Sequence, residues 1–167
     1  MREWEITKPK RLIAELETLR PDYGKFIAEP LARGFGITLG NSLRRVLLSS
    51  IPGAAIISVA IDGVKHEFST IEGVREDVIQ IILNLKEIRC LVDTDEIVTL
   101  RLSAEGSGQV TAADIQPHSQ VDIINPDQYI ATLDKCDGLN MEMQVSRGRG
   151  YALAEETLSA NQQIGVI

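Results

Sequence analysis

Hydrophobic positions repeat with a helical period in residues 31–50, where a glycine-rich turn runs directly into a predicted helix. Because proline cannot continue a helix, we expect this helix to end before Ile51-Pro52-Gly53. At about 100° per residue, one arc of the helix is apolar throughout, and the pattern predicts that this arc is a core face. The arc consists of Phe35, Leu39, Leu43, Val46 and Leu47.

The opposite arc of the same helix mixes apolar and cationic residues. It carries Ile37, Asn41, Arg44, Arg45 and Leu48, with Arg33 just upstream. An ordinary surface helix carries Lys and Glu on its outer face, whereas Arg beside Leu and Ile is typical of a helix covered by another protein. The alternative is a solvated face with two stray apolar residues, and composition alone does not choose between the two.

Glycine inside this helix predicts a close neighbour. Gly40 lies within the helical pattern, where glycine costs about 1 kcal/mol relative to alanine, and Gly34 and Gly36 stand at its entrance. We expect the backbone of a crossing helix or strand to approach here, since close approach is the usual reason for such a glycine.

The residues before the helix favour a β-hairpin. Residues 11–19 fit both a strand and a helix, so their periodicity does not decide between them. The turn-forming sequence at 20–24 precedes a strand-like segment at 25–28 that Pro30 closes, which predicts a hairpin over residues 11–30.

After the helix, the pattern predicts strands and a second helix. Residues 54–61 are apolar on both alternating faces, as in a covered strand, and Asp62-Gly63 predicts a tight turn to a returning strand at 64–68. Residues 69–72 form a capping-box pattern ahead of a second helix. The apolar stripe of this helix is Val74, Val78, Ile81, Ile82 and Leu85.

From Ile88 onward the pattern is one of short strands separated by turn residues. The last strand alternates apolar and polar residues, which indicates one buried and one wet face. The final residues, 152–167, hold no convincing element. The expected strands are 88–92, 97–102, 109–112, 121–124, 129–133 and 139–146.

Together these elements predict an α+β fold with two parts. Residues 1–52 form a hairpin plus helix, and residues 53–167 form a β-rich unit carrying one helix. A chain of 167 residues that is 44% hydrophobic is long enough for a real core.

Charge and composition exclude several classes of function. A net charge of −7 argues against direct binding to DNA or RNA. The sequence has no apolar run of about 18 residues and no secretory pattern, so we expect a soluble cytosolic protein without a membrane partner. Two cysteines in such a chain fit a reducing compartment.

Metal and catalytic sites are not favoured. Cys90, Cys136, His66 and His118 offer four zinc ligands on paper, but none lies within chelating distance of another in sequence. His66-Glu67 is more typical of a surface pair than of acid–base catalysis, because no nucleophile is placed beside it. We therefore expect no catalytic residue, no metal and no cofactor.

Two glycine-containing segments allow ligand binding. Gly34 to Gly40 resembles a dinucleotide-binding turn superficially, although its third glycine falls one residue late. A small nucleotide-binding enzyme is therefore the alternative function. Residues 147–151, Arg-Gly-Arg-Gly-Tyr, predict either an ordinary charged loop or a loop that binds an acidic partner or phosphate. Of the two ligands, a protein partner is preferred because the whole chain is acidic.

The segment at residues 29–53 resembles the N-terminal domain of the α subunit of bacterial and plastid RNA polymerase. Further blocks resemble the same family in order and at its spacing, so the likeness covers nearly the whole chain. These blocks are 61–64, 66–70, 72–74, 82–86, 110–115 and 145–151.

The resemblance implies a non-catalytic subunit of a nucleotidyltransferase complex, in the bacterial cytoplasm or the plastid stroma. It implies a homodimer with a second α chain that serves as the platform for the β and β′ subunits. Arg45 is then the expected β contact, and Lys86, Arg147 and Arg149 are further large-subunit contacts. The full predicted interface is Arg33, Phe35, Ile37, Asn41, Arg44, Arg45, Leu48, Lys86, Arg147 and Arg149.

The sequence departs from the family pattern at its end. In the family, the chain returns after an insert domain to complete the dimerisation unit and then continues to a DNA-binding C-terminal domain. This sequence stops at Ile167. The resemblance therefore predicts a fragment or an incomplete product in which part of the dimerisation unit is missing.

Overall fold

The computed structural model describes residues 7–20, 23–153 and 166–167. The chain divides into two compact units, residues 1–49 and residues 50–167. Each unit is described below by itself.

The first unit contains a short hairpin and a long helix. Strands β1 (Leu12–Ala14) and β2 (Phe26–Ala28) pair in an antiparallel register, and a single 3-10 turn, Leu16–Thr18, lies between them. The predicted hairpin is therefore confirmed, and the helical alternative for its first half is limited to that turn. Helix α1 (Phe35–Ser50) follows, as the pattern predicted.

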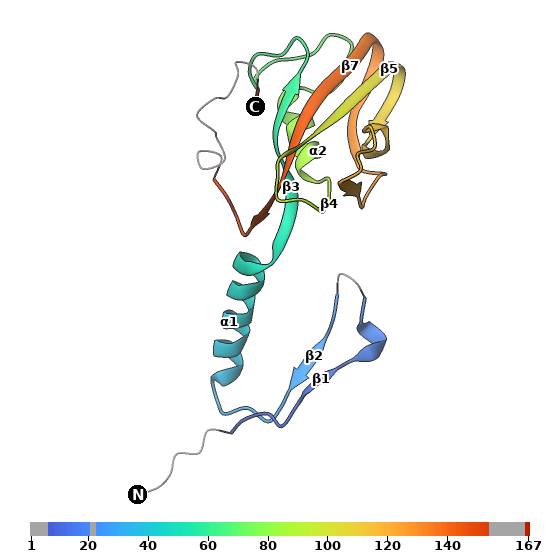
Figure 1. Cartoon of the computed structure of the whole chain (residues 1–167). Helices are drawn as coiled ribbons and strands as arrows, with labels where there is room; N and C mark the ends of the chain where they lie inside the picture. The colour runs from blue at the N-terminus through green and yellow to red at the C-terminus, as the bar shows by residue number, and fades with distance from the viewer. Residues whose placement is uncertain (1–6, 21–22, 154–165) are drawn as a thin grey trace, which may run out of the picture. The chain divides into compact units, whose positions relative to one another are not determined.

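The second unit is an antiparallel sheet with one helix against it (Figure 1). Its strands lie in the order β5-β7-β3-β4-β6, and helix α2 (Val78–Lys86) contacts β7 and β3. The α+β class predicted from sequence is confirmed. The strands are β3 (Pro52–Ile61), β4 (Cys90–Val92), β5 (Val98–Thr111), β6 (Val121–Ile123) and β7 (Tyr129–Arg149).

In two places, two short strands predicted from the sequence are parts of one long strand. The segments predicted at 97–102 and 109–112 are both parts of β5, and those at 129–133 and 139–146 are both parts of β7. The separation was wrong because glycine bulges let a strand continue through a turn-like sequence. The register of β5 on β7 shifts on either side of Gly106, whose φ is +87°.

The strand predicted after Asp62-Gly63 does not form. The turn itself is present, with the Val64 N–H donating to the Ile61 carbonyl at 3.1 Å, but residues 64–68 are not a strand. Beside the turn, β3 pairs with β7 on one side, and Val59 and Ala60 pair with Ile167 and Val166 on the other, so both positions are occupied. β3 also begins two residues before the predicted 54–61, and within that range Ala55 is exposed, so the expectation that both faces are covered was wrong at this residue.

Helix α2 begins later than the capping-box pattern predicted. Its cap is Asp77, whose carboxylate accepts a hydrogen bond from the Gln80 N–H at 2.7 Å. Residues 69–72 precede it in an irregular segment, so the predicted cap was wrong. Of the predicted stripe, Val78, Ile81 and Leu85 are buried in the helix, and they pack on the sheet.

The core of the second unit follows the alternation of β7. As predicted, one set of its side chains is buried and the intervening set is exposed. The buried set packs toward α2, so the other face of the sheet is the outer face. The buried residues are Leu139, Met141, Met143 and Val145, and the exposed ones are Asn140, Glu142 and Gln144.

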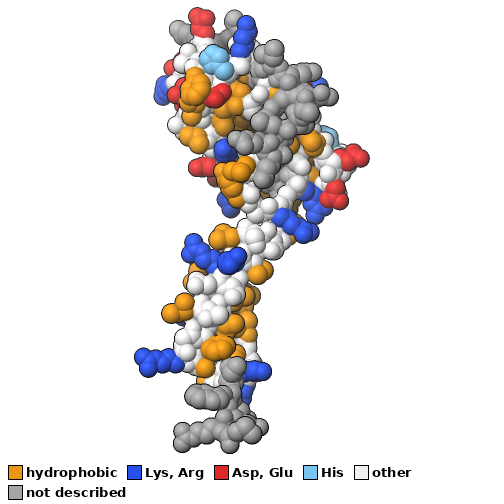
Figure 2. Space-filling view, turned by 90° about the vertical axis from the view of Figure 1, so that its left-hand side faces the viewer, with side chains coloured by type: hydrophobic (Ala, Val, Ile, Leu, Met, Phe, Trp, Pro, Cys, Tyr) orange, Lys and Arg blue, Asp and Glu red, His pale blue; other side chains and the backbone are white. Residues whose placement is uncertain are grey.

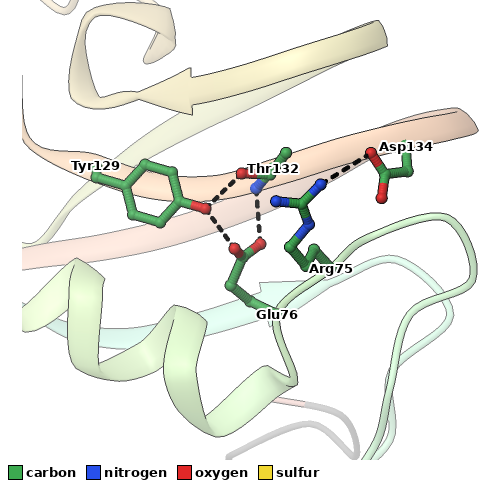
Figure 3. A network of polar contacts seen from close by, with 5 residues as sticks. All are labelled: Arg75, Glu76, Tyr129, Thr132 and Asp134. Atoms are coloured by element: carbon green, nitrogen blue, oxygen red, sulfur yellow. Dashed lines mark hydrogen bonds and ion pairs between the residues drawn. The ribbon is translucent and has the colours of Figure 1, made fainter.

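A polar network fixes the segment before α2 to the start of β7 (Figure 3). The Glu76 carboxylate accepts hydrogen bonds from the Tyr129 hydroxyl and, at 2.6 Å, from the Thr132 N–H. Nearby, Arg75 forms an ion pair with Asp134 at 3.5 Å. Burial acts to raise the pKa of Glu76, but the bonds from Tyr129 and Thr132 outweigh it, so the pKa lies below 4.5.

We expect Glu76→Gln to lower the free energy of unfolding by about 1–2 kcal/mol at pH 7, because two hydrogen bonds to a charged acceptor are weakened. A lowered folded-state pKa stabilises the fold above the unfolded pKa near 4.5, and this contribution is lost as the pH falls through the folded-state value. Urea unfolding followed by circular dichroism at pH 7 and pH 3 measures the difference, which should shrink at pH 3. Exposed Glu72→Gln is the matched control, and equal effects of the two variants would contradict the assignment.

Candidate subunit interface

Helix α1 has no buried residue among those the structure describes. Leu43, in the middle of the arc predicted as core, is 62% exposed, and Phe35 and Leu39 are exposed as well. The core-face prediction is therefore wrong for this chain by itself. The arc is apolar as expected, but the described residues provide no apolar surface that packs on it.

The side chains of the mixed arc are exposed as well. Leu48 is 65% exposed, and Ile37 and Asn41 are also exposed. Figure 2 shows hydrophobic and basic side chains over the surface of α1, with no acidic side chain among them in that view. This surface has the composition of a protein contact on both of its arcs.

The arginines of this region lack acidic neighbours. Arg33, Arg44 and Arg45 are exposed and form no ion pair with the described residues. Residues 30–61 contain no Asp or Glu at all, although the whole chain carries a net charge of −7. The region is thus a local positive patch, and it suits a carboxylate-bearing partner.

The described residues place no atom close to the glycines inside α1. A Cβ added at Gly36 or Gly40 would find nothing within 4 Å among the described residues. The predicted close approach of another backbone is therefore not made by any residue that the structure describes. Glycine lowers the stability of a helix interior, and most helices in proteins depend on packing of an apolar face.

The other predicted contact residues lie in the second unit, at one end of its sheet. Arg147 and Arg149 belong to β7 and pair with Ala54 and Pro52, so the prediction of a loop there was wrong. The reason is that β3 begins immediately after α1 and extends the pairing. The Arg147 guanidinium forms an ion pair with Asp95 at 3.1 Å.

Lys86 is exposed on the last residue of α2. The chain enters β4 four residues later, at Cys90, which pairs with the same Ala54 that pairs with Arg147. The fold therefore brings Lys86 toward the end of the sheet that holds Arg147 and Arg149. The sequence alone did not indicate this arrangement, because it depends on the pairing of Ala54 with Cys90 and with Arg147, both far from it along the chain.

Three exposed apolar residues escaped the sequence analysis. Ile97, Leu91 and Ile124 are 56%, 60% and 54% exposed. Each stands beside a residue whose side chain is directed to the core, so alternation places all three on the outer face. The alternation of Ile97 with buried Val98 was the available signal, but the short strands around the other two gave none.

Other candidate chemistry is weak. No three His, Cys, Asp or Glu side chains gather at a possible metal site in the described part of the chain. His66 lies at the surface with Nδ1 3.1 Å from the Ser69 hydroxyl. Burial raises the pKa of the Cys90 thiol, which disfavours the reactive thiolate, and the Cys136 side chain lies outside the described residues. Among the described helices, none is long and apolar enough to cross a membrane.

The glycine-rich turn does not have the setting of a nucleotide site. Gly36 and Gly40 lie inside α1, and the preceding strand β2 belongs to an antiparallel hairpin. A dinucleotide-binding turn joins a parallel strand to a helix N-terminus.

Comparison with known proteins gives one matching family and several relatives with one name. The family described as the RNA polymerase Rpb3/RpoA insert domain matches residues 59–167. The DNA-directed RNA polymerase subunit alpha of Alkaliphilus metalliredigens is 55% identical over 163 residues, covering 98% of this chain and 51% of the relative.

Further relatives carry the same name. The subunit alpha of Symbiobacterium thermophilum is 60% identical over 145 residues, covering 87% of this chain and 46% of the relative. That of Alkaliphilus oremlandii is 52% identical over 167 residues, covering 100% and 52%. The chain thus spans about half the length of these relatives. None of these relatives supports the nucleotide-binding alternative.

We expect Leu43→Ala to change the free energy of unfolding by less than about 1 kcal/mol when the protein is dilute enough to be monomeric, because its side chain contacts no core. Leu102→Ala is the contrasting variant, since Leu102 is 1% exposed and core Leu→Ala changes cost about 2–5 kcal/mol. Urea unfolding of the full chain gives both values. A loss at Leu43 as large as at Leu102 would mean that α1 packs within its own chain.

Proposed function

The chain belongs to the RNA polymerase Rpb3/RpoA insert domain family, and on this premise we propose that it is an assembly subunit of DNA-directed RNA polymerase. Its task is to bind other subunits, whereas the polymerisation chemistry belongs to them. The observation that carries the proposal is α1, a 16-residue helix with no buried residue, whose arginines form no ion pair with the described residues.

Each arc of α1 receives a different partner in this proposal. The apolar arc around Leu43 packs on a second α chain, which forms a homodimer. The mixed arc meets a large subunit, with Arg45 as the contact to β. The dimer then serves as the platform on which β and β′ assemble. Two partners account for the exposure of both arcs, whereas a single partner on one side of the helix would account for only one of them.

The two parts of the chain have separate roles in this proposal. Residues 1–52 contribute to the dimerisation unit, and residues 53–167 form the insert domain. The family match over residues 59–167 supports the second assignment. Lys86, Arg147 and Arg149 supply further contacts to the large subunits from the exposed end of the sheet.

The remaining parts of the proposal concern what the chain does not bind and where it acts. It holds no catalytic residue and no cofactor, and it makes no direct contact with nucleic acid, for which its net charge of −7 is unfavourable. It acts in the cytoplasm, where bacterial transcription takes place.

We expect Arg45→Ala to weaken capture of the β subunit about tenfold or more, because truncation of an arginine at an interface centre typically costs above 1 kcal/mol. The measurement is a titrated pull-down of β by the tagged chain. Arg101→Ala is the matched control, since Arg101 is an exposed arginine paired with Glu142 on the sheet. Undiminished capture by the Arg45 variant would refute its assignment to β.

We expect the chain to have the solution mass of a dimer by light scattering, and Leu43→Asp to reduce it to that of a monomer, because a charge in an apolar interface is desolvated without a partner. Circular dichroism tests whether both proteins keep their secondary structure. A monomeric wild-type chain at all concentrations would show that this chain does not dimerise through α1 alone.

A further inference from the structure

The hydrophobic core of this chain lies in only one of its two units. The buried apolar residues that form the core cluster all lie between Val59 and Val145, within the second unit. In the first unit, every residue that the structure describes is exposed or only partly buried. Burial of apolar surface is the dominant favourable contribution to folding, and the described residues of the first unit do not provide it.

The hairpin of the first unit has few interactions to stabilise it. β1 and β2 pair over three residues each, and their apolar side chains are open, with Leu12 65% and Phe26 55% exposed. The ion pair of Lys25 with Glu15 at 2.9 Å is exposed as well, and such pairs contribute little. Because an isolated two-stranded hairpin is at most marginally stable in water, the hairpin gives α1 no firm support.

The amino-acid composition of α1 is unfavourable for a helix without a partner. Gly36 and Gly40 lie inside it, and glycine is a poor helix former. The hydroxyls of Ser42 and Ser49 each bond to the carbonyl four residues earlier, at 2.9 and 2.7 Å, a pattern that slightly destabilises a helix. Isolated helices shorter than about 12–15 residues are marginal even when rich in alanine. α1 is close to that limit with 16 residues and contains no alanine.

The charges of α1 do not compensate for this composition. The helix contains no Asp or Glu, so neither an i,i+4 ion pair nor an acidic first turn is available to it. Its last turn holds no basic residue, although a positive charge there would complement the helix dipole. α1 therefore depends for its stability on the packing of its apolar arc.

Helix α2 has the interactions that α1 lacks. The Asp77 carboxylate caps its first turn at 2.7 Å, Lys86 lies in its last turn, and Val78, Ile81 and Leu85 are buried. α2 is only nine residues long, so capping and packing stabilise it in place of length. The two helices thus differ in whether the described residues of one chain supply what a helix needs.

We propose that the first unit folds stably only when two chains pair, so that formation of α1 is coupled to dimerisation through its apolar arc. This inference rests on the proposed function and adds that pairing orders the helix on which the dimer is built. The second unit stays folded in the single chain, because residues of that chain form its core. Part of the free energy of pairing is then spent on ordering α1, as at other interfaces that fold on binding.

Amide hydrogen exchange of the full chain, read by mass spectrometry, measures local opening in each unit. The wild-type protein is compared at a concentration where light scattering gives the mass of a dimer and at one where it gives that of a monomer. We expect peptides from α1 to exchange at least about tenfold faster in the monomer, because a helix without its packing face opens readily. Peptides from residues 139–145 of β7 should exchange at the same rate in both states.

Trypsin gives a second readout at named peptide bonds, because cleavage within a helix or strand requires local opening. Arg45 of α1 and Arg101 of β5 are both exposed, so they form a matched pair of sites. Leu43→Asp, expected to be monomeric, is digested beside the wild-type dimer at the same protein concentration. We expect the bond after Arg45 to be cut severalfold faster in the variant, and the bond after Arg101 to be cut equally slowly in both.

The outcomes separate this inference from the proposed function. Equal protection of α1 in the monomer and the dimer would show that the helix is stable alone, which overturns the inference while dimerisation stands. Loss of protection in β7 on dilution would also overturn it, because pairing would then support the whole chain. If the wild-type chain is monomeric at every concentration, both the dimer and its coupling to α1 are refuted.

Discussion

Burial of the apolar side of β7 beneath α2 is the interaction on which the second unit depends. Met143 and Val145 on the strand and Val78 and Ile81 on the helix are fully buried, and the sheet extends on both sides of them. The described residues of one chain form this core, so the second unit has a hydrophobic interior of its own. Nothing comparable exists for α1, whose apolar residues have no core to join in the described chain. The asymmetry between the two units is the main physical reason to regard this chain as part of an assembly.

Sequence patterns predicted the elements that local physics specifies. The period of α1, the hairpin at 11–30 and the alternation along β7 each follow from neighbouring residues, and all three are confirmed. Predictions failed where distant residues decide. The segment at 64–68 has a suitable turn before it, but β7 on one side and residues 166–167 on the other already pair with that end of β3. Likewise, the local sequence around Gly106 predicts the end of a strand, but β5 continues past Gly106 because it pairs with β7 on both sides of it.

In the candidate interface, too, the sequence predicted the features that neighbouring residues decide and missed those that distant residues decide. The mixture of Arg44, Arg45 and Leu48 on one arc was visible in the sequence, because helical geometry needs only the spacing of residues. The pairing of β3 with β7 was not, since it joins residues about ninety positions apart in a register that aligns Gly53 with Gly148. A sequence also does not say whether an apolar arc is covered by its own chain, and on this point the core prediction for Leu43 failed.

The arginines of the proposed interface differ in the free energy that binding a partner carboxylate would cost. Arg147 is already held by Asp95 at 3.1 Å, in an exposed pair of the kind that contributes about 0–1 kcal/mol, so a partner carboxylate can replace Asp95 at little cost. Arg45 forms no ion pair with the described residues, and ordering such a side chain costs about 0.5–1.5 kcal/mol. Only a charge-assisted bond, preferably bidentate and shielded from water by neighbouring apolar groups, exceeds that cost comfortably. In the proposed interface, Leu48 beside Arg45 provides that shielding. An arginine and its apolar neighbour therefore stabilise an interface together, because the bond of the arginine to a carboxylate is weaker when water reaches it.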